Sequence, residues 1–377
     1  MKTQNSRIPA IDGLRTLAVL GVLWTHVWMF FKNIPMKVGG LDLNRGMAFG
    51  RHGVDLFFVI SGFCMYLMYA SRIDHFSASN FFGFLKKRWL RIAPAFYMIV
   101  VFDSFLLLYH TGIFPLKQMS YHLLFINIFL DQYDFAPHYW SLATEFHFYL
   151  LFPFLFLRLR SQRELSLRVF ALMAVCLIFR LILFYNHTND ILEKETITST
   201  AIWYRFIEFG FGIIAAQLYV LKRVLPRWAI GSSGFILGLL ISYAGKIIIT
   251  TEFVRHFGTK AFIFRAFAEP IMTFGFGWML ISLITSGGIF TRVLSSRPFL
   301  FLGKISYSFY LWHWFVAHLV SNWLIAWGGM NLKTFYLSLL ISLVVAIPIA
   351  FLSFRLFEAP YFKRNPKLKK MAYVEVV

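Results

Sequence analysis

The sequence is poor in cysteine and in acidic residues, and it has no long polar stretch. Its 377 residues include two cysteines and 17 aspartates and glutamates, against 37 lysines and arginines. Cys64 and Cys176 both lie in apolar segments, and two cysteines are too few for a disulfide framework or a metal cluster. Because no polar segment is long enough to bury a core of its own, the sequence predicts no separate water-soluble domain.

Motifs of several common enzyme classes are also missing. The sequence has no glycine-rich phosphate loop, no dinucleotide-binding glycine pattern and no His-Glu-x-x-His zinc spacing, so no metal site is predicted. A net charge of +20 can indicate nucleic-acid binding, but here the basic residues stand in short loops between apolar segments. That distribution predicts anionic membrane lipids and polyanionic small molecules as partners, and no nucleic acid.

Long apolar segments make up most of the chain. Hydrophobic residues account for 59% of the sequence, and the mean hydropathy is +0.66. Apolar stretches of about 20 residues recur along the chain, which predicts an all-α, polytopic bundle of membrane helices. The candidate segments lie near residues 12–31, 53–71, 93–112, 118–131, 140–157, 165–185, 199–220, 228–249, 262–285, 305–327 and 334–356.

The segment 118–131 is short, and the charges of the loops argue against its crossing. If it re-enters or lies in the interface, about 22 basic residues fall on the cytoplasmic side and about 9 outside, as the positive-inside rule requires. We therefore expect about ten transmembrane helices, with both termini cytoplasmic. The aromatic and basic stretch 73–91 predicts an amphipathic interfacial helix that leads into the third span. Residues 1–362 would form the membrane domain, and residues 363–377 a basic cytoplasmic tail.

An ionisable side chain inside the first span is the strongest functional signal. His26 lies near the far end of segment 12–31, and Arg15 lies near its start on nearly the same face, roughly 16 Å of rise away. Ionisable groups in membrane helices are costly and mark functional sites. The expected topology puts Asp55 and Glu145 at the depth of His26, and a carboxylate beside a histidine suits general-base chemistry. A histidine that only hydrogen-bonds a neighbouring helix is the alternative.

Two arginines mark the cytoplasmic end of the third predicted span. Arg88 and Arg91 stand three positions apart on one helical face, just before a proline. Arginine pairs suit the bidentate binding of phosphate groups. A basic anchor that only orients the span would have the same pattern, so both interpretations stay open.

Polar residues also recur within two later spans. Ser306, Tyr310 and His313 fall on one face of a helix, where they would line a cavity or tunnel, or join neighbouring helices by hydrogen bonds. Arg205 and Glu208 stand three apart within another span. Their opposite charges predict a self-neutralising structural pair.

Seven short motifs along the chain resemble those of the acyltransferase-3 family of integral membrane O-acyltransferases. They are Ile11-Asp-Gly-Leu-Arg15 with His26, Gly53-Val-Asp-Leu-Phe-Phe-Val-Ile-Ser-Gly-Phe63, Arg88-x-x-Arg91, Trp140-Ser-Leu-x-x-Glu145, Arg205-x-x-Glu208-Phe-x-x-Gly212, Ser306-Tyr-Ser-Phe-Tyr-Leu-Trp-His313 and Phe354-Arg-x-x-Glu358-x-Pro360. Each motif is weak alone, but together and in this order they cover almost the whole chain.

The resemblance implies a membrane enzyme with its donor and its acceptor on opposite sides. The family moves an acyl group, typically acetyl from cytoplasmic acetyl-CoA, to a hydroxyl of an extracytoplasmic carbohydrate such as a surface polysaccharide or glycolipid. It also implies a stand-alone form without a C-terminal hydrolase-like domain, in a bacterial inner membrane. A transporter of a lipid-linked sugar or a small anion is the alternative function.

The resemblance also assigns roles to residues. His26 matches the family's essential histidine and would act as general base, assisted by Glu145 or Asp55. An acyl-histidine relay is the alternative chemistry. The residues expected to bind or line the path of the acyl-CoA donor are Arg15, Arg88, Arg91, Tyr310 and His313.

Overall fold

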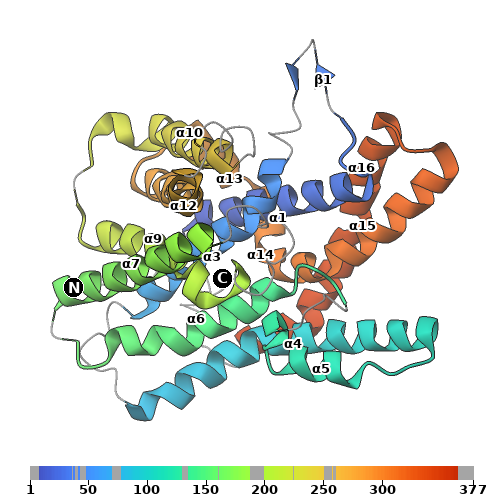
Figure 1. The fold of residues 1–377 in the computed structure, drawn as a ribbon, viewed down its shortest axis with the longest axis horizontal. Coiled ribbons are helices and arrows are strands. Elements are labelled where there is room, and N and C mark those ends of the chain that lie inside the picture. The colour runs from blue at the N-terminus through green and yellow to red at the C-terminus, as the bar shows by residue number, and fades with distance from the viewer. Residues whose placement is uncertain are drawn as a thin grey trace.

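The computed structural model describes residues 8–35, 37–38, 41–42, 48–69, 78–129, 135–159, 161–186, 199–223, 225–249, 257 and 260–363. In this part of the chain, ten long helices form a bundle. They are α1 (Pro9–Phe30), α3 (Gly53–Tyr69), α4 (Ala78–Thr111), α6 (Trp140–Phe156), α7 (Gln162–Asn186), α9 (Ile202–Val220), α10 (Gly231–Ile249), α12 (Ala261–Thr285), α15 (Ser306–Gly328) and α16 (Leu332–Ser353) (Figure 1). The predicted all-α membrane bundle is confirmed.

Six of these helices are long and apolar enough to cross a membrane, and they are α1, α4, α7, α10, α12 and α16. Of the other four, α3 and α6 have 17 residues each, a length of about 26 Å that is close to the thickness of a hydrocarbon core. Helices α9 and α15 are longer, but both carry polar side chains in their interiors. The protein is an integral membrane protein, and its ten long helices coincide with the ten predicted spans.

In the segment 118–131, the described residues 118–129 form no helix that could span a bilayer. Its described part forms α5 (Leu116–Leu123) and the single turn η3 (Asn127–Phe129), and Phe125 between them has a left-handed φ of 58°. Eight residues rise only about 12 Å, so α5 is far too short to cross. The hydroxyl of Tyr97 donates to the carbonyl of Leu123 at 2.5 Å and ties this segment to α4. The prediction that this segment does not cross is confirmed.

The described part of the predicted interfacial stretch 73–91 leads directly into the third long helix. From Ala78 onward it is the first part of α4, which continues through Pro94 to Thr111 as one helix of 34 residues. Such a helix is about 51 Å long, whereas the hydrocarbon core of a bilayer is about 30 Å thick. One end of α4 therefore extends beyond the apolar layer. Residues 73–77, and the predicted tail from residue 364, lie outside the described residues.

Short elements connect the long helices. They are a two-stranded antiparallel hairpin of β1 (Lys37–Val38) and β2 (Leu41–Asp42), the 3₁₀ turns η1 (Ala48–His52) and η4 (Arg227–Ala229), the helices α13 (Ile289–Leu294), α14 (Arg297–Lys304) and α17 (Ala359–Lys363), and a π-helical turn η6 (Phe354–Glu358). Helix α14 packs against the start of α1, where Thr16 donates to the carbonyl of Phe299 at 2.6 Å.

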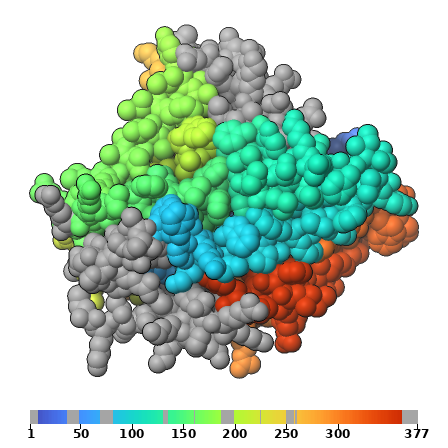
Figure 2. Space-filling view, turned by 90° about the horizontal axis from the view of Figure 1, so that it is seen from below, coloured from blue at the N-terminus to red at the C-terminus, as the bar shows by residue number. Residues whose placement is uncertain are grey.

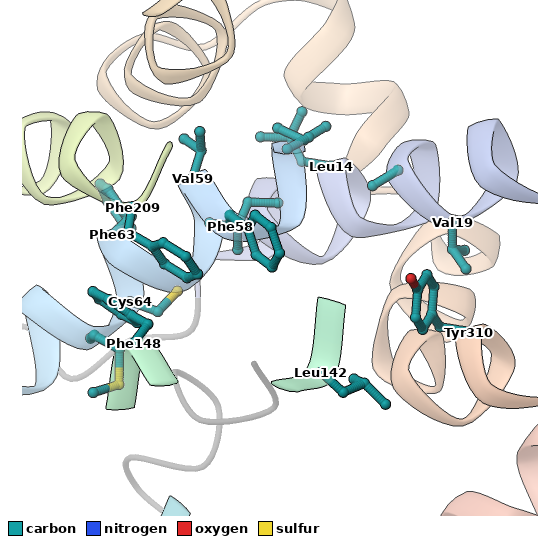
Figure 3. Close-up of a cluster of buried hydrophobic side chains, with 14 of the residues drawn as sticks. Leu14, Val19, Phe58, Val59, Phe63, Cys64, Leu142, Phe148, Phe209 and Tyr310 are labelled. Carbon is teal, nitrogen blue, oxygen red and sulfur yellow. The ribbon is translucent and has the colours of Figure 1, made fainter. Parts of the chain in front are cut away.

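Helix α3 lies in the interior and packs closely against α9. A Cβ atom on Gly62 would lie 2.1 Å from the carbonyl oxygen of Phe209, and one on Gly212 would lie 2.0 Å from that of Val59. Only glycine permits this approach, as at many interfaces between membrane helices. The rings of Phe58 and Phe209 stack beside the contact at 4.7 Å (Figure 3). The close packing fixes the rotation of α3, and so fixes where its polar side chains point.

Helix α1 lies between two pairs of helices. The α15–α16 pair packs on one side of it, and the α10–α12 pair lies on the other (Figure 1). Figure 2 shows a second face, where α4 runs between α6 and α7 on one side and the C-terminal helices on the other. The helices α1, α3, α4, α6 and α15, together with η6, carry most of the candidate site.

Candidate active site

A cavity opens among α1, α3, α4, α6 and α15, and it is lined by both charged and apolar side chains. The empty space among its lining side chains, including the open mouth of the cavity, is about 690 Å³. The charged lining residues are three bases and two acids, namely Arg15, Arg91, Lys304, Glu145 and Glu358. The mixture indicates a site for a ligand that has an anionic part and an extended apolar part.

Two of the three bases have no carboxylate within ion-pair distance among the described residues. Arg15 pairs with Asp12 at 3.2 Å on its own helix, whereas Arg91 and the exposed Lys304 form no such pair. The acids are engaged by hydroxyls instead. Glu145 accepts hydrogen bonds from Ser61 at 2.9 Å and Tyr149 at 2.6 Å, and Ser308 donates to Glu358. Arg91 and Lys304 are therefore available to phosphate groups.

The structure separates the two arginines that were predicted to act together. Arg91 lines the cavity, but Arg88 does not, because its side chain is only 1% exposed and lies in the core. The guanidinium of Arg88 faces the rings of Phe84 and Tyr149 at 5.8 and 5.9 Å. Arg88 thus packs on Tyr149, the residue that hydrogen-bonds Glu145. Arg88 supports the cavity wall and is not placed to touch a ligand in it.

Two hydroxyl groups lie together where the cavity ends. The hydroxyls of Ser141 and Tyr310 are 2.8 Å apart, and both lie within hydrogen-bond distance of the carbonyl oxygen of His138, at 2.9 and 3.0 Å. These are three contacts, but the two hydroxyls have only two protons to donate. One contact is always unfilled, so either proton can turn toward a ligand at little cost.

A cluster of histidines lies next to this end of the cavity. Nδ1 of His26 is 2.7 Å from Nε2 of His313, and their rings are nearly parallel, with centroids 5.0 Å apart. The ring of His138 lies 4.8 Å from that of His313, and the edge of Trp314 packs on His26 at 4.8 Å. His26 does not line the cavity itself. Tyr310 stands between the cavity and the histidines and touches both.

Neither carboxylate that was expected to assist His26 forms a hydrogen bond with it. Asp55 is held instead by Arg205 at 2.9 Å and by Nδ1 of His52 at 2.6 Å, and Glu145 faces the cavity. The charges of the loops predict depth in the membrane but not the rotation of a helix about its axis. The partner of His26 is His313, which the sequence had placed only in the lining of the donor path.

The predicted pair of Arg205 and Glu208 is confirmed, with a separation of 3.2 Å, and it belongs to a larger buried ion network. Arg180 pairs with Glu269 at 2.7 Å, and Glu269 lies 3.7 Å from Arg205. Asp55 completes the network on α3. The network joins α3, α7, α9 and α12 by ion pairs.

Three site residues were not found by sequence reasoning. They are Lys304 and Glu358 in the cavity and His138 beside the histidine pair. Lys304 and Glu358 stand in or beside motifs quoted above. The position of a basic loop residue or of an acid at a helix end does not predict that its side chain lines a cavity. His138 follows a short loop, and a loop has no periodicity from which its contacts could be predicted.

Known proteins resemble the chain over most of its length. A family model described as an acyltransferase domain matches residues 8–355. The O-acetyltransferase OatA of Staphylococcus aureus (strain NCTC 8325 / PS 47) is 25% identical over 379 residues, which cover 96% of this chain and 58% of that protein. A putative O-acetyltransferase of S. aureus strain COL is 25% identical over 393 residues, with the same coverage. The chain thus spans less than two thirds of these relatives. No solved structure matches it.

Proposed function

The chain belongs to the acyltransferase-3 family, and we propose that it is a membrane O-acyltransferase that moves an acetyl group from cytoplasmic acetyl-CoA to a hydroxyl of a carbohydrate on the other side of the membrane. The observation that carries the proposal is a chain of contacts from the cavity to the histidines. A cavity lined by Arg91 and Lys304 is also lined by Tyr310, and Tyr310 adjoins the pair of His26 and His313. The names of the relatives support acetyl as the transferred group.

The bases of the cavity would hold the anionic end of the donor. Arg91 and Lys304, with Arg15 deeper inside, are suited to the phosphates of coenzyme A, because guanidinium and ammonium groups bind phosphate through charge-assisted hydrogen bonds. The apolar side chains of the lining, among them Phe57 and Ile60, suit the pantetheine arm. That arm would direct the thioester toward the end of the cavity.

The thioester carbonyl would lie against Tyr310 and Ser141. Their hydroxyl protons are shared among three contacts, so each can be donated to the carbonyl oxygen. As an acceptor oxygen attacks, negative charge develops on that carbonyl oxygen, and positioned donors stabilise it. Since His26 does not line the cavity, the contact between Tyr310 and Ser141 has to open for the acyl group to reach it.

The proposed transfer conserves every proton. His26 removes the proton of an acceptor hydroxyl, and the oxygen attacks the thioester carbon. The C–O bond forms as the C–S bond breaks, and coenzyme A leaves as a thiolate. The proton held by His26 then passes to the thiolate, which gives free coenzyme A and an O-acetyl ester. General-base catalysis of this kind contributes about 10²- to 10⁴-fold in rate.

The proposed orientation has the cavity opening toward the cytoplasm and His26 in the outer half of a bacterial inner membrane. The distribution of basic residues supports it, because loops rich in lysine and arginine stay inside. Both termini would then be cytoplasmic, and the basic loops would contact anionic lipids. The acceptor would be a glycan or a glycolipid that reaches His26 from the outside.

Transfer of label from acetyl-CoA tests this function. Purified protein in lipid would be mixed with [¹⁴C]acetyl-CoA and envelope glycans, and ester-linked label on the glycans would be counted. The wild type is expected to transfer label, the variant His26→Ala to lose transfer while still binding acetyl-CoA, and the variant His110→Ala, at an exposed position, to resemble the wild type. No transfer by the wild type, together with movement of labelled sugar across vesicles, would favour a transporter.

A further inference from the structure

The hydrogen bonds around His313 determine which of its nitrogens carries a proton. Nδ1 of His313 lies 2.5 Å from the backbone carbonyl oxygen of Tyr310, one turn earlier on α15. A carbonyl oxygen can only accept a hydrogen bond, so Nδ1 of His313 is the donor. A neutral imidazole has one N–H and one lone pair, and its other nitrogen, Nε2, must therefore be an acceptor.

The same argument extends to His26. The acceptor nitrogen Nε2 of His313 lies 2.7 Å from Nδ1 of His26, so Nδ1 of His26 is the donor in that contact. In neutral His26 the lone pair must then be on Nε2. That nitrogen forms no hydrogen bond with a described residue, and His26 is only half-buried. Nε2, the basic nitrogen of His26, is therefore not engaged by a described residue and is available to accept a proton from a substrate.

We propose that His313 is the positioning residue of the proposed base, and that the chain from the Tyr310 carbonyl through His313 to His26 makes Nε2 of His26 the atom that takes the acceptor's proton. This inference rests on the proposed function. His313 has the place that a carboxylate has in a serine hydrolase triad, where the third group fixes the tautomer and the orientation of the histidine. A neutral acceptor does the same without burying a negative charge in the membrane.

Packing around the pair makes this arrangement rigid. The side chain of His313 is fully buried, and its ring lies within 15° of parallel to that of His26. The rings of Trp314 and His26 meet edge-on, at an interplanar angle of 86°. Neither imidazole can turn without displacing a neighbour, so the direction of the proton chain is fixed by the helices α1 and α15.

Tyr310 contacts both the histidine pair and the end of the cavity. Its backbone carbonyl orients His313, and its hydroxyl lies at the end of the cavity beside Ser141. Because Tyr310 contacts both His313 and the end of the cavity, the same turn of α15 would set the position of the thioester and the orientation of the His26 imidazole. This coupling explains why the polar face of α15 continues from Ser306 through Tyr310 to His313.

Two variants at one position separate this role from a structural one. His313→Leu removes the acceptor and is expected to lower kcat about 100-fold, with the KM for acetyl-CoA unchanged. His313→Gln keeps an amide N–H for the Tyr310 carbonyl and an amide oxygen for His26, so it should recover at least tenfold of that loss. His318→Leu is the control, because His318 is an exposed residue of the same helix that hydrogen-bonds Asn322 and lies against the ring of Phe30. Binding of acetyl-CoA verifies that each variant is folded.

Nitrogen NMR on protein labelled with [¹⁵N]histidine reads the tautomer directly, and the signals of His26 are those lost in His26→Ala. The wild type should show a proton on Nδ1 and a lone pair on Nε2 of His26, and His313→Leu should lose that preference. If His313→Leu retains kcat within twofold, or His26 carries its proton on Nε2 in the wild type, the positioning role is overturned while the function stands. If His26→Ala itself retains transfer, the proposed base fails instead.

Discussion

Replacing Tyr310 by phenylalanine removes one hydroxyl from the end of the cavity and little else. The ring is 5% exposed and packs against Phe57 with centroids 6.1 Å apart, so the phenyl group should keep its place. The carbonyl of His138 loses one donor but keeps Ser141 at 2.9 Å. The lost hydrogen bond should therefore lower the free energy of unfolding by only about 1 kcal/mol.

The expected effect on catalysis is much larger than the effect on stability. Loss of one donor to a developing oxyanion typically lowers kcat by about 10²- to 10³-fold, or about 3–4 kcal/mol in the activation free energy. We expect Tyr310→Phe to lower kcat about 100-fold with little change in the KM for acetyl-CoA, because the phosphates are held elsewhere. Initial rates of label transfer at varied acetyl-CoA measure both constants.

A matched control is available on α3. The hydroxyl of Tyr66 donates to Gln162 at 2.7 Å, away from the cavity, so Tyr66→Phe also removes one buried hydroxyl. That variant should keep the kcat of the wild type. If Tyr310→Phe and Tyr66→Phe had equal kcat values, the thioester carbonyl would not lie against Tyr310, and the assignment of the end of the cavity would be refuted.

Two further predictions concern the cavity and the ion network. Arg91→Ala and Lys304→Ala should each raise the KM for acetyl-CoA about tenfold, since a charge-assisted hydrogen bond contributes about 1.5–3 kcal/mol. A KM equal to that of the wild type would show that the phosphates bind elsewhere. Glu269→Gln leaves Arg180 and Arg205 with less compensating charge in the core, and it should lower the free energy of unfolding by about 3 kcal/mol. Thermal unfolding in detergent measures this, and an unchanged melting temperature would contradict it.

Much of the fold could be predicted from the sequence because the bilayer imposes simple rules. Length and apolar composition predict helices, and the charges of the loops separated ten crossing segments from the short segment 118–131. The boundary of α4 was less predictable. An amphipathic stretch and a span can form one continuous helix, and Pro94 does not interrupt it.

The site was predicted only in part, because the depth of a residue in the membrane does not determine which neighbouring helix its side chain faces. Asp55 and Glu145 were expected at the level of His26, but the close contact of α3 with α9 turns Asp55 toward Arg205. Arg88 and Arg91 are three positions apart, and that is enough for one to face the core and the other the cavity. Which groups meet depends on packing between helices, which single-helix periodicity does not contain.

Sealed proteoliposomes with the protein in a single orientation show whether the acetyl group passes through the protein from one side of the membrane to the other. Labelled acetyl-CoA would be supplied only on the side of the cavity opening, and an impermeant carbohydrate acceptor only on the other. Ester-linked label is expected on the acceptor in the opposite compartment, and none with His26→Ala. Label on an acceptor placed only on the donor side, with none across the membrane, would contradict transfer across the membrane.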